Sequence, residues 1–75
     1  MTKQVKAFVA KLAEVSQQQD TSLFSEGELM SISKRMGMQL ADFSAFLDVL
    51  CHECYLLHKG RRTYALSRSV RNRHA

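Results

Sequence analysis

The feature that most constrains this 75-residue sequence is a pair of short apolar runs around a glycine near its C-terminal end. The runs YLLHK and TYALS flank the tripeptide GRR. Two runs of this kind, joined by a few residues that include a glycine, predict a β-hairpin. We expect Gly60 to supply the positive φ of the turn. The side chains expected to anchor the hairpin to the core are Tyr55, Leu57, Tyr64 and Leu66.

Ahead of the hairpin, the first expected element is a helix from about Lys3 to Gln17. Its apolar residues recur at helical spacing, which is typical of an amphipathic helix. QQQDTS then breaks the period and predicts a loop. The following SLF is long enough only for a brief strand, in which we expect Leu23 and Phe24 to be buried. The apolar residues of the helix are Val5, Phe8, Val9, Leu12 and Val15.

A second helix is expected after a capping-box pattern. Ser25 can accept a hydrogen bond from the backbone three residues on, and Glu28 can reach back to the cap. Gly37 is suited to the left-handed residue that follows a helix, with Lys34 and Arg35 in the last turn. The apolar face comprises Leu29, Ile32 and Met36.

A third helix is expected from about Leu40 to His52 or Glu53. The order is then helix, short strand, helix, helix and hairpin, with few residues between the last two helices. This predicts a mainly α (α+β) winged helix-turn-helix domain over residues 1–67, with the hairpin as a small antiparallel wing. Residues 68–75 are expected to form a basic, flexible tail. The predicted buried stripe of the third helix is Leu40, Phe43, Phe46, Leu47, Leu50 and Cys54.

Positive charge is concentrated at the C-terminal end. Residues 1–57 contain five Lys or Arg against seven Asp or Glu, a net −2, whereas residues 58–75 contain six Lys or Arg and no acid. A basic segment without acids favours an acidic partner, such as nucleic acid or an acidic protein surface. The candidate nucleic-acid-binding residues are Lys59, Arg61, Arg62 and Arg68, together with Lys34 and Arg35.

The third helix is a poor candidate for reading bases. In helix-turn-helix proteins this helix enters the major groove, where Arg, Lys, Asn and Gln read base edges. Its exposed face instead offers carboxylates, which phosphates repel. We therefore expect weak, non-specific and salt-dependent DNA contact through the wing, and a protein partner for the acidic face. The candidate protein-interaction residues are Asp42, Asp48 and Glu53.

Catalytic and metal sites are not expected. CHECYLLH offers Cys51, His52, Cys54 and His58, but a zinc site needs a convergent tetrahedron and this sequence has no second cysteine pair. No phosphate-binding loop or nucleophile–base arrangement is visible, so we predict a domain that is not an enzyme and holds no cofactor. Two cysteines favour a reducing, intracellular setting, and no apolar run is long enough to span a membrane.

With the hairpin placed, the sequence resembles the C-terminal winged-helix domain of minichromosome maintenance (MCM) helicases, most closely the branch containing the eighth paralogue. The resemblance rests on DFSAFLDVL, YLLHKG and TYAL, which stand in the same order as in that branch, with SKRMG before them. It covers nearly the whole chain. One departure concerns the end of the third helix, where that branch has a glycine and this sequence has Cys54.

The resemblance implies a nuclear parent protein with an ATP-dependent DNA helicase motor elsewhere, acting in replication and recombination repair. This piece would then be a non-catalytic accessory domain, monomeric when isolated, that contacts protein partners or neighbouring helicase subunits and weakly contacts DNA. The alternative is a free-standing winged-helix transcription regulator that reads DNA, and a third hypothesis is a purely structural domain without DNA contact.

Overall fold

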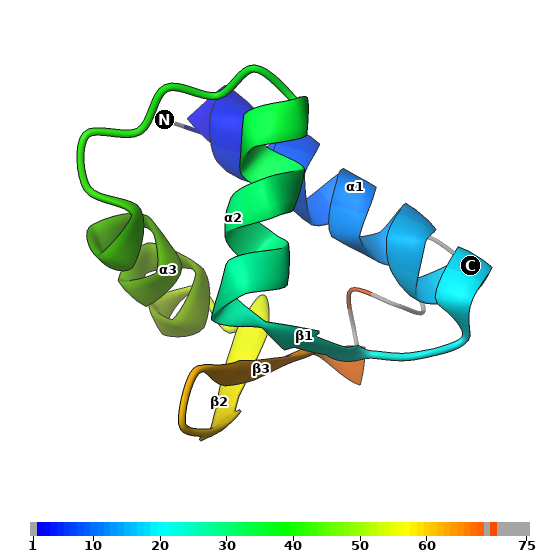
Figure 1. Cartoon of the computed structure of the whole chain (residues 1–75). Coiled ribbons are helices and arrows are strands. Elements are labelled where there is room, and N and C mark those ends of the chain that lie inside the picture. The colour runs from blue at the N-terminus through cyan, green and yellow to red at the C-terminus, as the bar shows by residue number, and fades with distance from the viewer. Residues whose placement is uncertain (1, 69, 71–75) are drawn as a thin grey trace.

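Residues 2–68 and 70 are described in a computed structural model, in which three helices lie on one side of a three-stranded antiparallel sheet (Figure 1). The other side of the sheet faces away from the helices. This arrangement confirms the predicted mainly α winged helix-turn-helix fold. The elements are α1 (Thr2–Gln19), β1 (Leu23–Ser25), α2 (Glu26–Arg35), α3 (Phe43–His52), β2 (Leu56–Gly60) and β3 (Thr63–Leu66).

α1 runs two residues further than the sequence predicts. Gln17 to Gln19 are helical rather than part of a loop, because glutamine is a good helix former. The helix ends where Asp20 adopts a left-handed φ of 52°. The amide of Thr21 then donates to the carbonyl oxygen of Ser16 at 3.1 Å, which closes the turn.

α2 begins and ends as the sequence predicts. Ser25 accepts from the amide of Glu28, and the Glu28 side chain accepts from the amide of Ser25 at 2.9 Å, which completes the capping box. Gly37 has a φ of 76° at the other end. The amide of Met38 donates to the carbonyl oxygen of Ser33 at 3.1 Å, which is the Schellman arrangement that a left-handed residue permits.

α3 begins at Phe43 and not near Leu40, because Asp42 caps it. The Asp42 carboxylate accepts from the amide of Ala45 at 3.1 Å. Within the predicted stripe, three residues are buried, Leu40 and Phe43 are half-buried, and Cys54 is exposed. The inclusion of Cys54 was therefore wrong. The buried residues of α3 are Phe46, Leu47 and Leu50.

Cys54 is exposed because it lies beyond the end of α3 and turns the chain. Its φ is 65°, and the amide of Tyr55 donates to the carbonyl oxygen of Leu50 at 2.9 Å. The left-handed turn that the family pattern assigns to a glycine is thus made by a cysteine. A non-glycine residue in this conformation costs about 1 kcal/mol, which the backbone hydrogen bonds of the turn offset.

The core lies between the helices and the inner face of the sheet. The rings of Phe8 in α1 and Phe46 in α3 meet edge-to-face, with centroids 5.4 Å apart. The largest fully buried side chains come from all three helices and from β1 and β2. Leu66 of β3 belongs to the same buried cluster, so each element contributes to a single core. The largest fully buried side chains are Phe8, Leu12, Phe24, Leu29, Phe46, Leu50 and Leu56.

The core continues past the predicted domain boundary at residue 67. Val70 is 4% exposed and belongs to the same buried cluster. The division at residue 67 stays a prediction, as does the tail, of which residues 69 and 71–75 lie outside the described part of the chain. Within residues 2–68 and 70, no helix is long and apolar enough to cross a membrane.

β3 is the central strand and fixes which leucine of the hairpin is buried. Leu56 pairs with Leu66, so both side chains point into the core, and Leu56 is 1% exposed. Leu57 pairs with Ala65 on the outer face and is 48% exposed. The expectation that Leu57 anchors the wing was therefore wrong by one residue, and one residue is enough to exchange the two faces of a strand.

Leu23 is also exposed, contrary to expectation. It pairs with Ala65 on the outer face and is 53% exposed, whereas Phe24 beside it is 1% exposed. A three-residue strand places alternate side chains on opposite faces, so only one of the two can reach the core.

The turn of the wing is made by a different residue from the one predicted. Gly60 does not have a positive φ; Arg62 does, at 53°. The strand register shifts between His58 and Gly60, which leaves Lys59 as the extra residue of a β-bulge. The bulge alters the path of the strand before the turn, so the left-handed conformation falls two residues after the glycine.

The register of β2 predicts that two adjacent leucines differ sharply in their contribution to stability. Leu56→Ala should lower the free energy of unfolding by about 2–5 kcal/mol because it leaves a cavity. Leu57→Ala should change it by less than about 1 kcal/mol because the side chain is half in water. Urea denaturation followed by circular dichroism measures both, and equal losses would contradict the register.

The backbone at the glycines predicts a second contrast. Gly37→Ala should destabilise the domain by about 1 kcal/mol because its φ is left-handed. Gly60→Ala meets no atom within 4 Å and needs no positive φ, so it should be neutral or stabilising by about 0.4–1 kcal/mol. The same denaturation experiment compares them. A lower free energy of unfolding in Gly60→Ala would indicate that Gly60 has the positive φ that the sequence predicts.

Candidate nucleic-acid and protein interface

The basic wing, comprising Lys59, Arg61 and Arg62, is held on a rigid base. All three side chains are exposed. The amide of Glu26, the first residue of α2, donates to the carbonyl oxygen of Arg62 at 2.8 Å, and the hydroxyl of Thr63 donates to the carbonyl oxygen of Arg61 at 3.1 Å. The turn is thereby fixed against the start of α2, while its guanidinium groups remain available to a partner.

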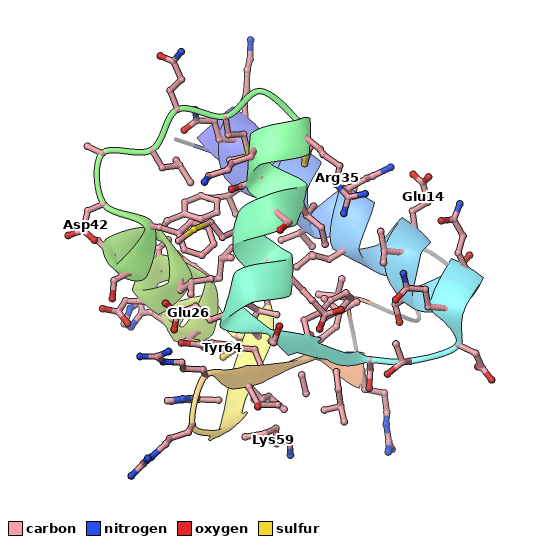
Figure 2. All side chains as sticks on the ribbon, viewed as in Figure 1. Glu14, Glu26, Arg35, Asp42, Lys59 and Tyr64 are labelled. Atoms are coloured by element: carbon pink, nitrogen blue, oxygen red, sulfur yellow. The ribbon has the colours of Figure 1, made fainter. Side chains whose placement is uncertain are left out.

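The other three candidate nucleic-acid-binding residues do not join the basic wing in one cluster. Lys34 and Arg35 are exposed in the last turn of α2. Figure 1 shows that end of α2 at the top of the molecule and the wing at the bottom, and Figure 2 labels Arg35 far from Lys59. Arg68 is exposed just beyond β3. A single short duplex contact therefore cannot be assigned to all six residues.

The acidic residues of the α3 region are exposed but spread along the helix. Asp42 caps its start, Asp48 lies within it and Glu53 caps its end. The ten residues of α3, at about 1.5 Å per residue, separate the two end residues by roughly 15 Å. Asp42 also has a structural role through its bond to Ala45. We call these three exposed residues the acidic edge of α3; they do not form one compact cluster, and α3 contains no Lys or Arg.

Tyr64 joins the wing to this acidic edge, which the sequence did not reveal. Burial raises the pKa of its phenol, and negative charge at Cys51, Glu26 and Asp48 raises it further. His58 stacks on the Tyr64 ring with centroids 4.8 Å apart and planes 11° from parallel. The inner side of the wing therefore faces carboxylates, and a phosphate meets less repulsion at its tip than at its base.

Glu26 is the functional neighbour that sequence reasoning missed. The sequence places it only within a capping pattern, yet it lies beside the wing because β1 pairs with β3 and ends where α2 begins. Figure 2 labels Glu26 and Tyr64 near one another, close to the start of α2. The position of Glu26 beside the wing depends on the strand order of the sheet. No local sequence pattern predicts that β1 pairs with the hairpin, so the sequence alone does not place Glu26 there.

The two cysteines and the histidines near them do not converge. Both cysteines are free thiols, Cys51 half-buried and Cys54 exposed. The ring of His58 stacks on the ring of Tyr64. Among residues 2–68 and 70, no group of three or more His, Cys, Asp or Glu is placed to hold a metal ion.

The two thiols should differ in reactivity. Burial, with a further effect from Asp48, raises the pKa of the Cys51 thiol, so little thiolate forms near neutral pH. In single-cysteine variants, Cys54 in Cys51→Ser should react with a disulfide reagent about tenfold or more faster than Cys51 in Cys54→Ser. In denaturant the two rates should converge, and equal rates in the folded protein would place Cys51 in solvent.

A surface groove lies between α1 and α2, away from the wing. Its volume is about 460 Å³ in the part lined by Val15, Phe24 and Ile32, with Arg35 at its rim. A second part, of about 380 Å³, continues along Lys11 and Met36. The lining mixes apolar and polar side chains without a convergent set of titratable groups.

These observations define the class of the domain. A helix-turn-helix whose second helix is acidic, followed by a basic two-stranded wing paired to β1, makes this a winged-helix domain. The chain belongs to the MCM8 winged helix domain family, whose model matches residues 1–68.

Curated relatives agree with the family assignment. A probable DNA helicase MCM8 of Arabidopsis thaliana is 35% identical over 71 residues, which cover 95% of this chain and 9% of that protein. The DNA helicases MCM8 of Xenopus laevis and Homo sapiens are 38% and 34% identical over 61 residues, covering 81% of this chain and 7% of each protein. The chain thus spans less than a tenth of the length of these relatives.

Proposed function

We propose that this domain is a non-catalytic accessory module of a nuclear DNA helicase acting in replication and recombination repair. Family membership supports its place beside a helicase motor. The motor would lie in the rest of the parent protein, because the relatives named DNA helicases are more than ten times longer than this chain. The module itself would contact protein partners and weakly contact DNA.

The observation that carries this proposal is the division of charge between α3 and the wing. α3 would be repelled by the phosphates that line the major groove, since its exposed carboxylates have no Lys or Arg beside them. The wing carries three exposed cations and is fixed to α2 by the bond from Glu26 to Arg62. DNA contact would therefore be made by the tip of the wing.

This mode of contact predicts weak affinity without sequence preference. Two or three phosphate contacts correspond to non-specific binding in the micromolar range or weaker, with each contact adding about 0.9 to the slope of log affinity against log salt. The acidic edge at Asp42, Asp48 and Glu53 would remain free for a basic protein surface, such as a neighbouring helicase subunit. The isolated domain would be monomeric.

A charge reversal in the wing tests the DNA contact. Arg61→Glu with Arg62→Glu should abolish measurable binding of a fluorescent duplex, or reduce the salt slope by about 2, because two phosphate contacts are lost. Anisotropy titrations at two salt concentrations measure the affinity and the slope. Both positions keep non-glycine residues, so the backbone strain at Arg62 is unchanged.

The matched control makes the same change of charge elsewhere. Lys3→Glu with Lys6→Glu alters two exposed residues of α1, whose N-terminal end lies far from the wing (Figure 1). It should weaken binding less than the wing variant. Equal effects would show that only net charge matters, and a strong preference between unrelated duplexes would favour a sequence-reading regulator instead.

A further inference from the structure

The outer face of the sheet carries an apolar row that no part of the described chain covers. Leu23 on β1 and Leu57 on β2 both pair with Ala65 on the central strand β3, so the three side chains share one face. The two leucines are 53% and 48% exposed, and Ala65 between them is 6% exposed. The small alanine is shielded by its neighbours and forms the floor of the row.

This apolar row lies on the side of the sheet opposite to the helices. Figure 1 shows all three helices on the other side. The side chains that face the helices from the same strands are Phe24, Tyr64 and Leu66, which belong to the core or pack against it. Leu23 and Leu57 are therefore outside the buried core cluster, and their exposed apolar surface is available to a partner.

Positive charge borders the apolar row at both ends of the strands. Lys59 and the two arginines of the turn lie at the hairpin end, and Figure 2 shows Lys59 on the side of the sheet away from the helices. Arg68 follows β3 at the opposite end and is exposed. The strand residues and their connections, 23–25 and 56–68, contain no Asp or Glu. An occupant of this face must therefore combine apolar and acidic groups.

The chemistry of the row distinguishes a protein from a nucleic acid. Single-stranded nucleic acids bind to sheets through aromatic side chains on which bases stack. The aromatic residues of this sheet, Phe24 and Tyr64, point toward the helices, and the outer row is aliphatic. Leu23 and Leu57 stand across three strands, about 9–10 Å apart, which matches apolar residues at i, i+4 and i+7 of a helix.

We infer that the outer face of the sheet is a docking surface for an acidic amphipathic helix of a protein partner. Its apolar residues would pack on Leu23, Ala65 and Leu57, and its carboxylates would lie toward the basic wing on one side and Arg68 on the other. Two copies of this face would repel one another because each is bordered by cations. This surface is separate from the acidic edge of α3, and the inference does not depend on DNA binding.

The test uses the whole 75-residue chain and a synthetic fluorescein-labelled peptide of about 15 residues, with leucines at i, i+4 and i+7 and glutamates on the flanks. We expect saturable binding in the micromolar to sub-millimolar range. A peptide with lysines in place of the glutamates, and another with serines in place of the leucines, should bind much more weakly. Backbone amide chemical shifts should change at Leu23, Leu57 and Ala65.

The decisive variant removes the apolar row without changing charge. Leu23→Thr with Leu57→Thr keeps strand-forming residues and should weaken binding of the acidic peptide about tenfold, while leaving duplex DNA binding unchanged. Met30→Gln, at an exposed apolar residue of α2, is the matched control and should bind the peptide normally. If circular dichroism shows that the threonine variant is unfolded, Leu23→Ala with Leu57→Ala takes its place.

Four results would overturn the inference. The lysine peptide could bind as well as the acidic one, or the shifts could map to the groove between α1 and α2. Oligothymidylate could produce the same shifts at the apolar row, which would make the surface a nucleic-acid site. Finally, sedimentation could show a dimer that the threonine variant disrupts, which would make the occupant a second copy. Loss of DNA binding in the wing variant alone would bear on the proposed function only.

Discussion

The rest of this structure depends on how its helices end. Each helix is followed by one residue with a left-handed φ, at Asp20, Gly37 and Cys54. After each, a backbone amide bonds to a carbonyl oxygen in the last helical turn, as Tyr55 does to Leu50. These turns set the direction in which the chain leaves each helix, and the third leads directly into β2. Because only one of the three residues is glycine, backbone hydrogen bonding rather than glycine placement directs the chain.

Charge is divided across the molecule in a way that separates its surfaces. Burial raises the pKa of the Tyr64 phenol, and the carboxylates of Glu26 and Asp48 raise it further, so the base of the wing carries negative charge although its tip is basic. The tip of the wing and the borders of the outer sheet face are left as the cationic surfaces, and α3 as the anionic one. The charged groups that distinguish these surfaces lie on exposed residues. They therefore have little effect on the free energy of unfolding.

Local chemistry made part of this fold predictable. The capping box at Ser25 and the left-handed Gly37 follow from patterns within a few residues, and the order of elements follows from periodicity. The face of β2 was not predictable in this way, since YLLHK alternates equally well with Leu56 or Leu57 inside. The pairing with Leu66 decides between them, and pairing is a tertiary constraint. The position of Glu26 beside the wing depends on strand pairing too and was not predictable for the same reason. The exposure of the acids of α3 follows from helical periodicity and was predictable.

Arg62 keeps a charged side chain at a position where the backbone conformation favours glycine. Its left-handed φ is a conformation that glycine adopts freely and arginine adopts at a cost of about 1 kcal/mol. Gly60, two residues earlier, stands where the backbone needs no such freedom. The turn therefore keeps a guanidinium group at the position where a purely structural hairpin would have a glycine. The tip of the wing is thus better explained by the charge it presents than by the ease with which it folds.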